Sequence, residues 1–269
     1  MSHTAADELA EQIELYRKRR AEELRALAEV LVSADLLSDA SPLYAAASMA
    51  AGPLKQTGDD SPDPGRVYWG YAIEDLSLTL DGQWKGIPRN SAFEASLLTI
   101  IVQEYVPDTV HQLDVGYNNL RRADVDFWMR GIHEPNADDI CDIQCAWHLD
   151  THLYSEPSSS VHPKHHFQFG GNRVDGVADQ VRGIWMPDTP RVMTLPLDGV
   201  LAIDFVLAHY AGKAWMRLHE DSEYLDLRHM AARRYWCPVA ESIVDFFGAA
   251  KQQAQNHSAL KILPNLAWI

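Results

Sequence analysis

Cysteine is scarce in this sequence of 269 residues, and no long uninterrupted hydrophobic run occurs in it. The three cysteines, Cys141, Cys145 and Cys237, are too few and too scattered for the disulfide framework of a small secreted protein. No stretch reaches the roughly 18 apolar residues that a membrane helix needs, and the first residues lack the basic and apolar regions of a signal peptide. These absences predict a cytoplasmic protein with reduced thiols and no membrane association.

Positive charge is also in short supply. The chain has 23 Lys and Arg residues against 38 Asp and Glu residues, which gives a net charge of −15. Such a charge repels phosphate backbones over a Debye length of about 8 Å at physiological salt. Broad nucleic-acid binding is therefore not expected, whereas a local basic pocket stays compatible with the composition.

The first part of the chain is predicted to be helical. Apolar residues recur there at steps of three and four, which predicts one amphipathic helix over about residues 5 to 33. Its apolar stripe either packs on the same domain or binds a partner. Residues 52 to 65 are rich in Gly, Pro, Asp and Ser and indicate a loop or linker. We therefore divide the chain into an N-terminal helical segment (1–51), a linker (52–65) and a main domain (66–269).

The main domain mixes strands and helices. Strand-forming residues follow position 66, and Asp81-Gly82 indicates a hairpin turn. Ser91 and Glu94 match a capping box, which predicts a helix to about Val106. Asp198 is expected to cap a later helix, and Pro238 to lie in the first turn of the last one. The predicted class is α+β: an antiparallel sheet with a histidine-bearing hairpin, packed by an N-terminal helix and several C-terminal helices.

Histidine is concentrated in one segment, since five of the 12 histidines lie between residues 148 and 166. With the period of two of a strand, Trp147, Leu149 and Thr151 share one face, and the polar residues between them share the other. In a second strand Phe167 and Phe169 point away from the remaining polar positions. Pairing the two strands as a hairpin brings the polar side chains together on one face: His148, Asp150, His152, His166 and Gln168.

Three interpretations of this cluster stay open. In the first, His148, Asp150 and His152 bind a divalent metal, or His148 and Asp150 form a facial triad with the distant His209. In the second, the site works by acid–base catalysis, with one imidazole taking a proton, another donating one and Asp150 orienting the base. In the third, the histidines are a hydrogen-bonded polar face without chemistry. The candidate catalytic residues are Asp150, His152, His162, His166 and Gln168.

The segment HPKHHFQFGG and the later stretch PRVMTLPLDGVLAIDFVLAHY resemble a group of uncharacterised bacterial proteins. These share a strand ending in an acidic residue, an H-P-x-x-H strand ending in glycine and a helix with an F-[IV]-L core. The resemblance covers about residues 142 to 215 and offers no counterpart for His148 or His152. It implies a role linked to mobile elements or anti-phage defence, without specifying a reaction. The matching positions are Asp150, His162, Pro163, His166, Gly170, Phe205, Val206, Leu207 and Tyr210.

Two functions follow from these observations. The favoured one is an accessory or regulatory subunit of a bacterial, defence-linked system, which binds a protein partner or assembles as a homo-oligomer through its N-terminal helix. The alternative is a histidine-dependent hydrolase or nuclease that acts on a phosphodiester, with or without a bound divalent metal. The sequence leaves open whether the protein is an enzyme.

Overall fold

A single antiparallel sheet organises the fold, in which each strand pairs with the next one along the chain. The computed structural model describes residues 5–59, 63–80, 91–110, 116–136, 139–151, 165–170 and 192–252. The strands are β1 (Lys55–Gln56), β2 (Val67–Leu76), β3 (Ser91–Tyr105), β4 (Leu120–Asn136), β5 (Asp139–Thr151), β6 (His165–Phe169) and β7 (Val192–Met193). The helices are α1 (Ala5–Ser33), α2 (Ser41–Ala51), α3 (Gly116–Asn119), α4 (Gly199–Tyr210), α5 (Gly212–Leu218) and α6 (Ser222–Gln252). The α+β class is thus confirmed.

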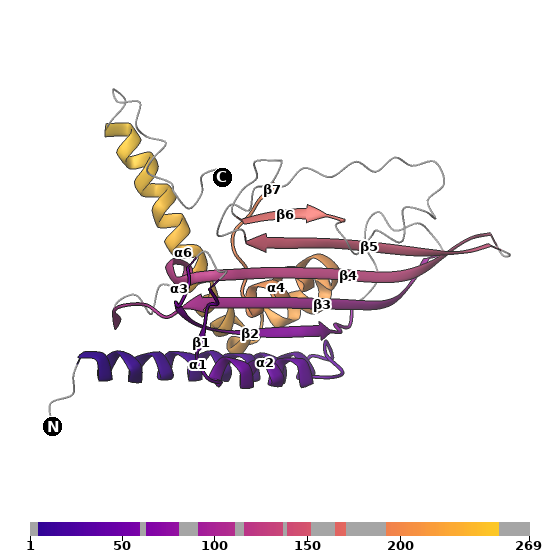
Figure 1. Cartoon of the computed structure of the whole chain (residues 1–269). Coiled ribbons are helices and arrows are strands. Elements are labelled where there is room, and N and C mark those ends of the chain that lie inside the picture. The colour runs from indigo at the N-terminus through magenta and orange to yellow at the C-terminus, as the bar shows by residue number, and fades with distance from the viewer. Residues whose placement is uncertain are drawn as a thin grey trace.

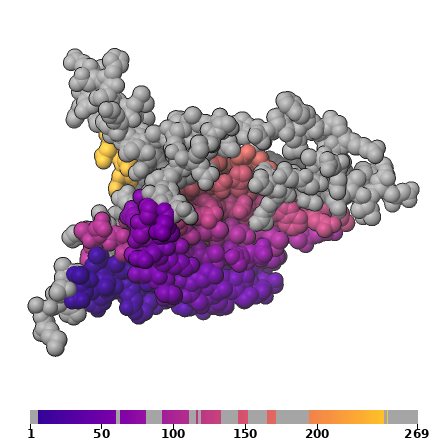
Figure 2. Space-filling model, in the orientation of Figure 1, coloured from indigo at the N-terminus to yellow at the C-terminus, as the bar shows by residue number. Residues whose placement is uncertain are grey.

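Helix α1 packs on its own domain. Its stripe of Leu24, Leu27 and Leu31 is at most 2% exposed, so the apolar face is buried within this chain. Helices α1 and α2 lie along the β2 side of the sheet (Figure 1). In a space-filling view they form a continuous surface, coloured indigo to violet (Figure 2). None of the helices in the described ranges has a stretch both long and apolar enough to cross a bilayer.

The two faces of the sheet differ in character. One face buries Ile73, Ile100, Val125 and Leu149 against the helices, and α4 lies behind β3 and β4 in Figure 1. Side chains alternate along a strand, so the residues between these point to the opposite side. We call that side the outer face. The apolar core therefore lies on the helical side, and polar strand residues collect on the outer face.

The helix expected over residues 91 to 106 is wrong, because this segment forms β3. Ser96, Leu98, Ile100 and Val102 are all at most 1% exposed, which is the alternation of a strand between β2 and β4. The β-branched run from Thr99 to Val102 suits a pleated surface better than a helix. The spacing of Ser91 and Glu94 resembled a capping box without being one. The turn expected at Asp81-Gly82 lies outside the described residues.

For the helices that follow the sheet, one prediction from the sequence is confirmed and another is wrong. Asp198 caps α4 as expected, since its Oδ1 accepts a hydrogen bond of 2.9 Å from the Leu201 amide. Pro238, however, lies inside α6, which begins at Ser222. The helix starts earlier because Asp221 caps it by accepting hydrogen bonds from the amides of residues 223 and 224. Cys237 is exposed on this helix.

Buried polar groups join α1, β3 and α6. Arg234 donates hydrogen bonds of 3.2 and 2.9 Å to the two carboxylate oxygens of Glu23, which also pairs with Arg20. Glu104 accepts hydrogen bonds from the hydroxyls of Tyr16 and Tyr235. The first helix, the sheet and the last helix are thereby tied together in the core.

Another buried carboxylate, Asp204 of α4, joins the C-terminal helices. It accepts hydrogen bonds from Trp215 Nε1 at 2.8 Å, from the Tyr224 hydroxyl at 2.9 Å and from Arg228 Nε at 3.0 Å. These three donors to its two oxygens compensate for the hydration that the Asp204 carboxylate loses on burial. Helices α4, α5 and α6 are therefore held to one another through this side chain.

Candidate metal centre

The site is built on the pairing of β5 with β6. Asp150 lies opposite His166, and His148 lies opposite Gln168. Cross-strand partners project to the same face of a sheet, so all four side chains lie on the outer face. The neighbours Leu149 and Phe167, also cross-strand partners, point to the core instead. The alternation predicted for the two strands is thus the one that the structure has.

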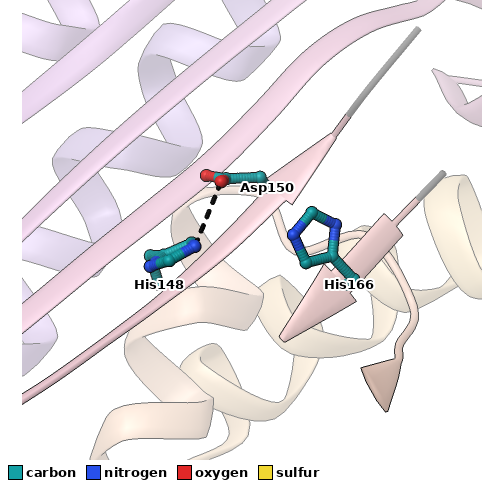
Figure 3. A group of neighbouring side chains, drawn as sticks. All are labelled: His148, Asp150 and His166. Carbon is teal, nitrogen blue, oxygen red and sulfur yellow. Dashed lines mark ion pairs between the residues drawn. The ribbon is translucent and has the colours of Figure 1, made fainter. Parts of the chain in front are cut away.

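His148, Asp150 and His166 converge on a common point (Figure 3). His148 Nε2 lies 3.3 Å from Asp150 Oδ2, and the two imidazole rings are nearly perpendicular at a centroid distance of 6.2 Å. One ligand atom from each of the three residues lies within 4.8 Å of the other two. Metal–ligand bonds of about 2.0 to 2.2 Å place two ligands of one ion roughly 3 to 4 Å apart. Small side-chain adjustments would therefore bring these atoms onto one cation.

The surroundings of Asp150 favour a cation. Burial raises the pKa of the Asp150 carboxyl; the imidazole of His148 counteracts this, and the neighbouring carboxylates Asp124 and Asp126 add to the rise. Asp126 is the direct cross-strand partner of His148. Three carboxylates close together repel one another, and a bound divalent ion relieves that repulsion. Two imidazoles and a carboxylate are ligands that suit Zn, Mn or Fe(II).

Side chains of β4 fix the end of β5 beside the site. Asp124 Oδ1 accepts a hydrogen bond of 3.1 Å from the Thr151 amide, and Asp124 Oδ2 pairs with Arg122. The Thr151 hydroxyl donates to the Ala123 carbonyl at 2.9 Å and lies 3.0 Å from His165 Nδ1. The backbone next to Asp150 is thereby held in place. Such support from neighbouring groups keeps ligands oriented for a metal.

An aromatic cluster supports the same strands from the core side. The Trp147 ring packs against Phe127 at 5.2 Å, Phe167 at 5.3 Å and Phe205 at 5.4 Å between centroids. Trp147 Nε1 also donates a hydrogen bond of 3.0 Å to the Tyr210 hydroxyl. These contacts join β4, β5, β6 and α4 directly behind the candidate site. The site therefore lies on a firmly packed part of the sheet.

The structure brings together four of the residues predicted from the sequence, His148, Asp150, His166 and Gln168, while His152 and His162 lie outside the described residues. His209 is not a partner of His148. Its Nδ1 lies 2.7 Å from the Phe205 carbonyl oxygen on α4, on the helical side of the sheet.

Two findings at the site were not predicted. His166, expected only as a catalytic residue, belongs to the group of side chains whose atoms are close enough to hold a metal ion. Asp124 and Asp126 were overlooked altogether. The alternating sequence ADVDFW contained the signal, because it places both carboxylates on one face of a strand.

Comparison with protein-family models, with curated proteins and with solved structures found no match to this chain, so the candidate site is argued from its own geometry.

Proposed function

We propose that the protein is a metal-dependent hydrolase whose divalent ion is held by His148, Asp150 and His166. The observation that carries this proposal is the convergence of two imidazole nitrogens and one carboxylate oxygen within 4.8 Å. Three protein ligands leave coordination positions for water and for a substrate oxygen, as catalytic metal sites require. Structural zinc sites, in contrast, use four protein ligands.

The bound ion would supply a nucleophile. A divalent metal lowers the pKa of a coordinated water to about 7, so an ion held here would make hydroxide available near neutral pH. The chain's own contribution is to hold the ligands, through the packed Trp147 behind them and the Asp124–Thr151 hydrogen bond beside them. Hydrolysis needs no further co-substrate than water. The substrate class we propose is a phosphodiester, in which water adds to phosphorus and the P–O bond to the leaving alcohol breaks.

Calorimetric titration of metal-stripped protein with Zn²⁺, Mn²⁺ and Co²⁺ tests the site. We expect one ion per chain. Either His166→Ala or Asp150→Asn should weaken its binding by about tenfold to 100-fold or more. His229 is exposed on α6, far along the chain from the site, so His229→Ala is the matched control. Unaltered affinity in the His166 variant would remove the metal centre from consideration.

Hydrolysis of bis(p-nitrophenyl) phosphate and of short oligonucleotides, with each metal added back, tests the reaction. Activity that appears with metal and is lost in both ligand variants supports the hydrolase. A protein that binds the ion but cleaves none of these substrates would contradict the phosphodiesterase and leave a metal-binding protein.

The other function that we consider is an accessory subunit that binds a partner through the N-terminal helices. Four large apolar side chains on α1 and α2 support it, since Leu15, Val32, Tyr44 and Met49 are 40 to 45% exposed. The main apolar stripe of α1 is buried, however, and single exposed apolar residues are ordinary on a protein surface. We therefore place this function second. Light scattering of the wild type and of Val32→Glu would reveal a self-association that depends on this surface.

A further inference from the structure

Four cationic side chains gather on the outer face, at the corner where β1, β2, β3 and β4 meet. They are Lys55, Arg66, Arg121 and Arg122, and we call them the cationic corner. Lys55 is the cross-strand partner of Tyr68, which in turn is the partner of Tyr105. Arg122 alternates with the buried Ala123 and thus also points outward.

Tyrosine rings hold two of these guanidinium groups. Arg66 lies over the Tyr105 ring at 4.0 Å from its centroid, and Arg121 lies over the Tyr68 ring at 4.4 Å. Stacking orients a guanidinium plane, and although Arg121 already donates from one nitrogen to Gln103 Oε1, a guanidinium has further N–H groups that can bind an anion. Phosphate oxygens are among the anionic groups that such edges bind with two parallel hydrogen bonds.

The cationic corner contrasts with the chain as a whole, whose net charge is −15. Among the residues that the structure describes, two carboxylates, Asp63 and Asp124, lie among its four cations. Asp63 accepts a hydrogen bond of 3.1 Å from the Tyr105 hydroxyl, and Asp124 pairs with Arg122. More distant carboxylates act weakly here, because salt screens charges beyond about 8 Å. The local balance is thus positive on a negatively charged protein.

The cationic corner and the candidate metal centre share one face of one sheet. The pairing of Val125 with Leu149 places Asp124 beside Asp150, and Arg122 follows two residues along the same strand. With about 4.8 Å between strands and 3.3 Å per residue, Arg122 lies roughly 8 Å from Asp150, and Tyr68, which holds Arg121, lies roughly 20 Å from it. A small phosphate ester is too short to touch both. An extended chain of phosphodiesters reaches both at once.

We propose that the cationic corner binds the backbone of a single-stranded nucleic acid, one linkage of which reaches the metal centre. The cleavage part of this inference rests on the proposed hydrolase, whereas the binding part does not. A single strand can follow the sheet surface, and its bases can contact the half-buried Ile101 between the two sites. Binding is weak and salt-dependent, with a dissociation constant of about 10⁻⁴ to 10⁻⁶ M at physiological salt.

The test is fluorescence anisotropy of a labelled 12-nucleotide single strand, as DNA and as RNA, with the full chain in EDTA between 20 and 200 mM salt. Each phosphate contact contributes about −0.7 to the slope of log affinity against log salt. The double variant Arg66→Gln/Arg121→Gln should lose about tenfold in affinity at the lowest salt and should flatten the slope by about 1.4. Replacing both by lysine should preserve the slope.

Arg25→Gln is the matched control, because Arg25 is exposed on α1 and its replacement changes the net charge in the same direction. The proposal is overturned by an absence of binding at 20 mM salt, by a double variant that binds like the Arg25 variant, or by tighter binding of a 12-base-pair duplex measured in the same way. Circular dichroism checks that every variant is folded.

Metal titration separates this proposal from the proposed function. The double variant should bind the ion like the wild type, and His166→Ala should lose the ion but still bind the strand in EDTA. If the protein binds no metal but still binds the strand in a salt-dependent way, the proposed hydrolase is wrong and the proposed nucleic-acid surface is supported. If the ion binds and the strand does not, the cationic corner is refuted and the metal centre is untouched.

Discussion

Asp150 on β5 stands directly opposite His166 on β6, and its carboxylate lies 3.3 Å from His148 Nε2 in the same strand. One carboxylate thus meets an imidazole along the strand and another across it. Protons and metal ions bind to the same nitrogen and oxygen atoms of these side chains, so they compete for the site.

Metal affinity should therefore fall as the pH falls. Histidine must be neutral to bind a metal, and its ordinary pKa is about 6.5. Two histidine ligands give a loss on the order of 100-fold between pH 7.5 and pH 5.5. The raised pKa of Asp150 acts in the same direction, because its carboxyl takes up a proton at higher pH than usual. Calorimetry at three pH values measures this, with His148→Ala expected to give a shallower dependence. A flat profile would argue against imidazole ligands.

The buried carboxyl of Glu104 should make stability depend on pH. Burial raises the pKa of Glu104 from about 4.5 to about 7, although the hydroxyls of Tyr16 and Tyr235 donate to it. The folded state then holds the proton more tightly than the unfolded state. This contribution to stability is fully present below pH 4.5 and is lost as the pH rises through 7.

The loss amounts to about 3 kcal/mol. Glu104→Gln should reduce the difference in unfolding free energy between pH 5 and pH 8 by that order, because the amide does not titrate. Urea denaturation of both proteins at the two pH values measures it. An equal difference in wild type and variant would show that Glu104 is not the titrating group.

Asp204 should be among the most sensitive positions for stability. Asp204→Ala removes the acceptor of three donors from Trp215, Tyr224 and Arg228 at once, and buried donors without partners cost about 1 to 3 kcal/mol each. We expect a loss of roughly 3 to 5 kcal/mol, allowing for partial relaxation. Tyr224→Phe, which removes one hydrogen bond, should cost about 1 kcal/mol. Denaturation in urea ranks the two, and a reversed order would contradict the role given to Asp204.

Gly70 in β2 should tolerate no side chain. A Cβ atom there would lie 2.3 Å from the Val102 carbonyl oxygen and 3.0 Å from Gln103 Cα, both of the paired strand β3. Gly70→Ala must therefore push the two strands apart, at a cost of roughly 1 to 3 kcal/mol. Gly58 has open space around it, so Gly58→Ala is the control. Thermal unfolding compares them; equal melting temperatures would mean that β2 and β3 adjust freely.

Local patterns in the sequence predicted the parts of the fold that depend on neighbouring residues. The alternation around His148 and His166, the extent of α1 and the cap at Asp198 each involve only a few residues along the chain. The helix predicted for residues 91 to 106 was wrong, because the buried residues of this segment fit a strand only when β2 and β4 flank it. A short spacing such as that of Ser91 and Glu94 cannot report on such neighbours.

The candidate site was predictable to the same degree. Strand parity placed His148, Asp150, His166 and Gln168 on one face, since alternation is a property of each strand alone. The position of Asp126 beside His148 depends on the pairing of β4 with β5, and this pairing was not predicted from the sequence. The exclusion of His209 likewise required the packing of α4 on the opposite face of the sheet.

The ion pair between Glu23 and Arg234 joins residues that are 211 positions apart, whereas every strand of the sheet pairs with its neighbour in the chain. Strand pairing closes only short loops, which costs little entropy and proceeds quickly. During synthesis the sheet can therefore form one hairpin after another before α6 has been made. Part of the helical side of the sheet is then uncovered. A ribosome-bound chain that stops before residue 222 should thus be prone to aggregation and chaperone binding, until the last helix arrives and joins the first.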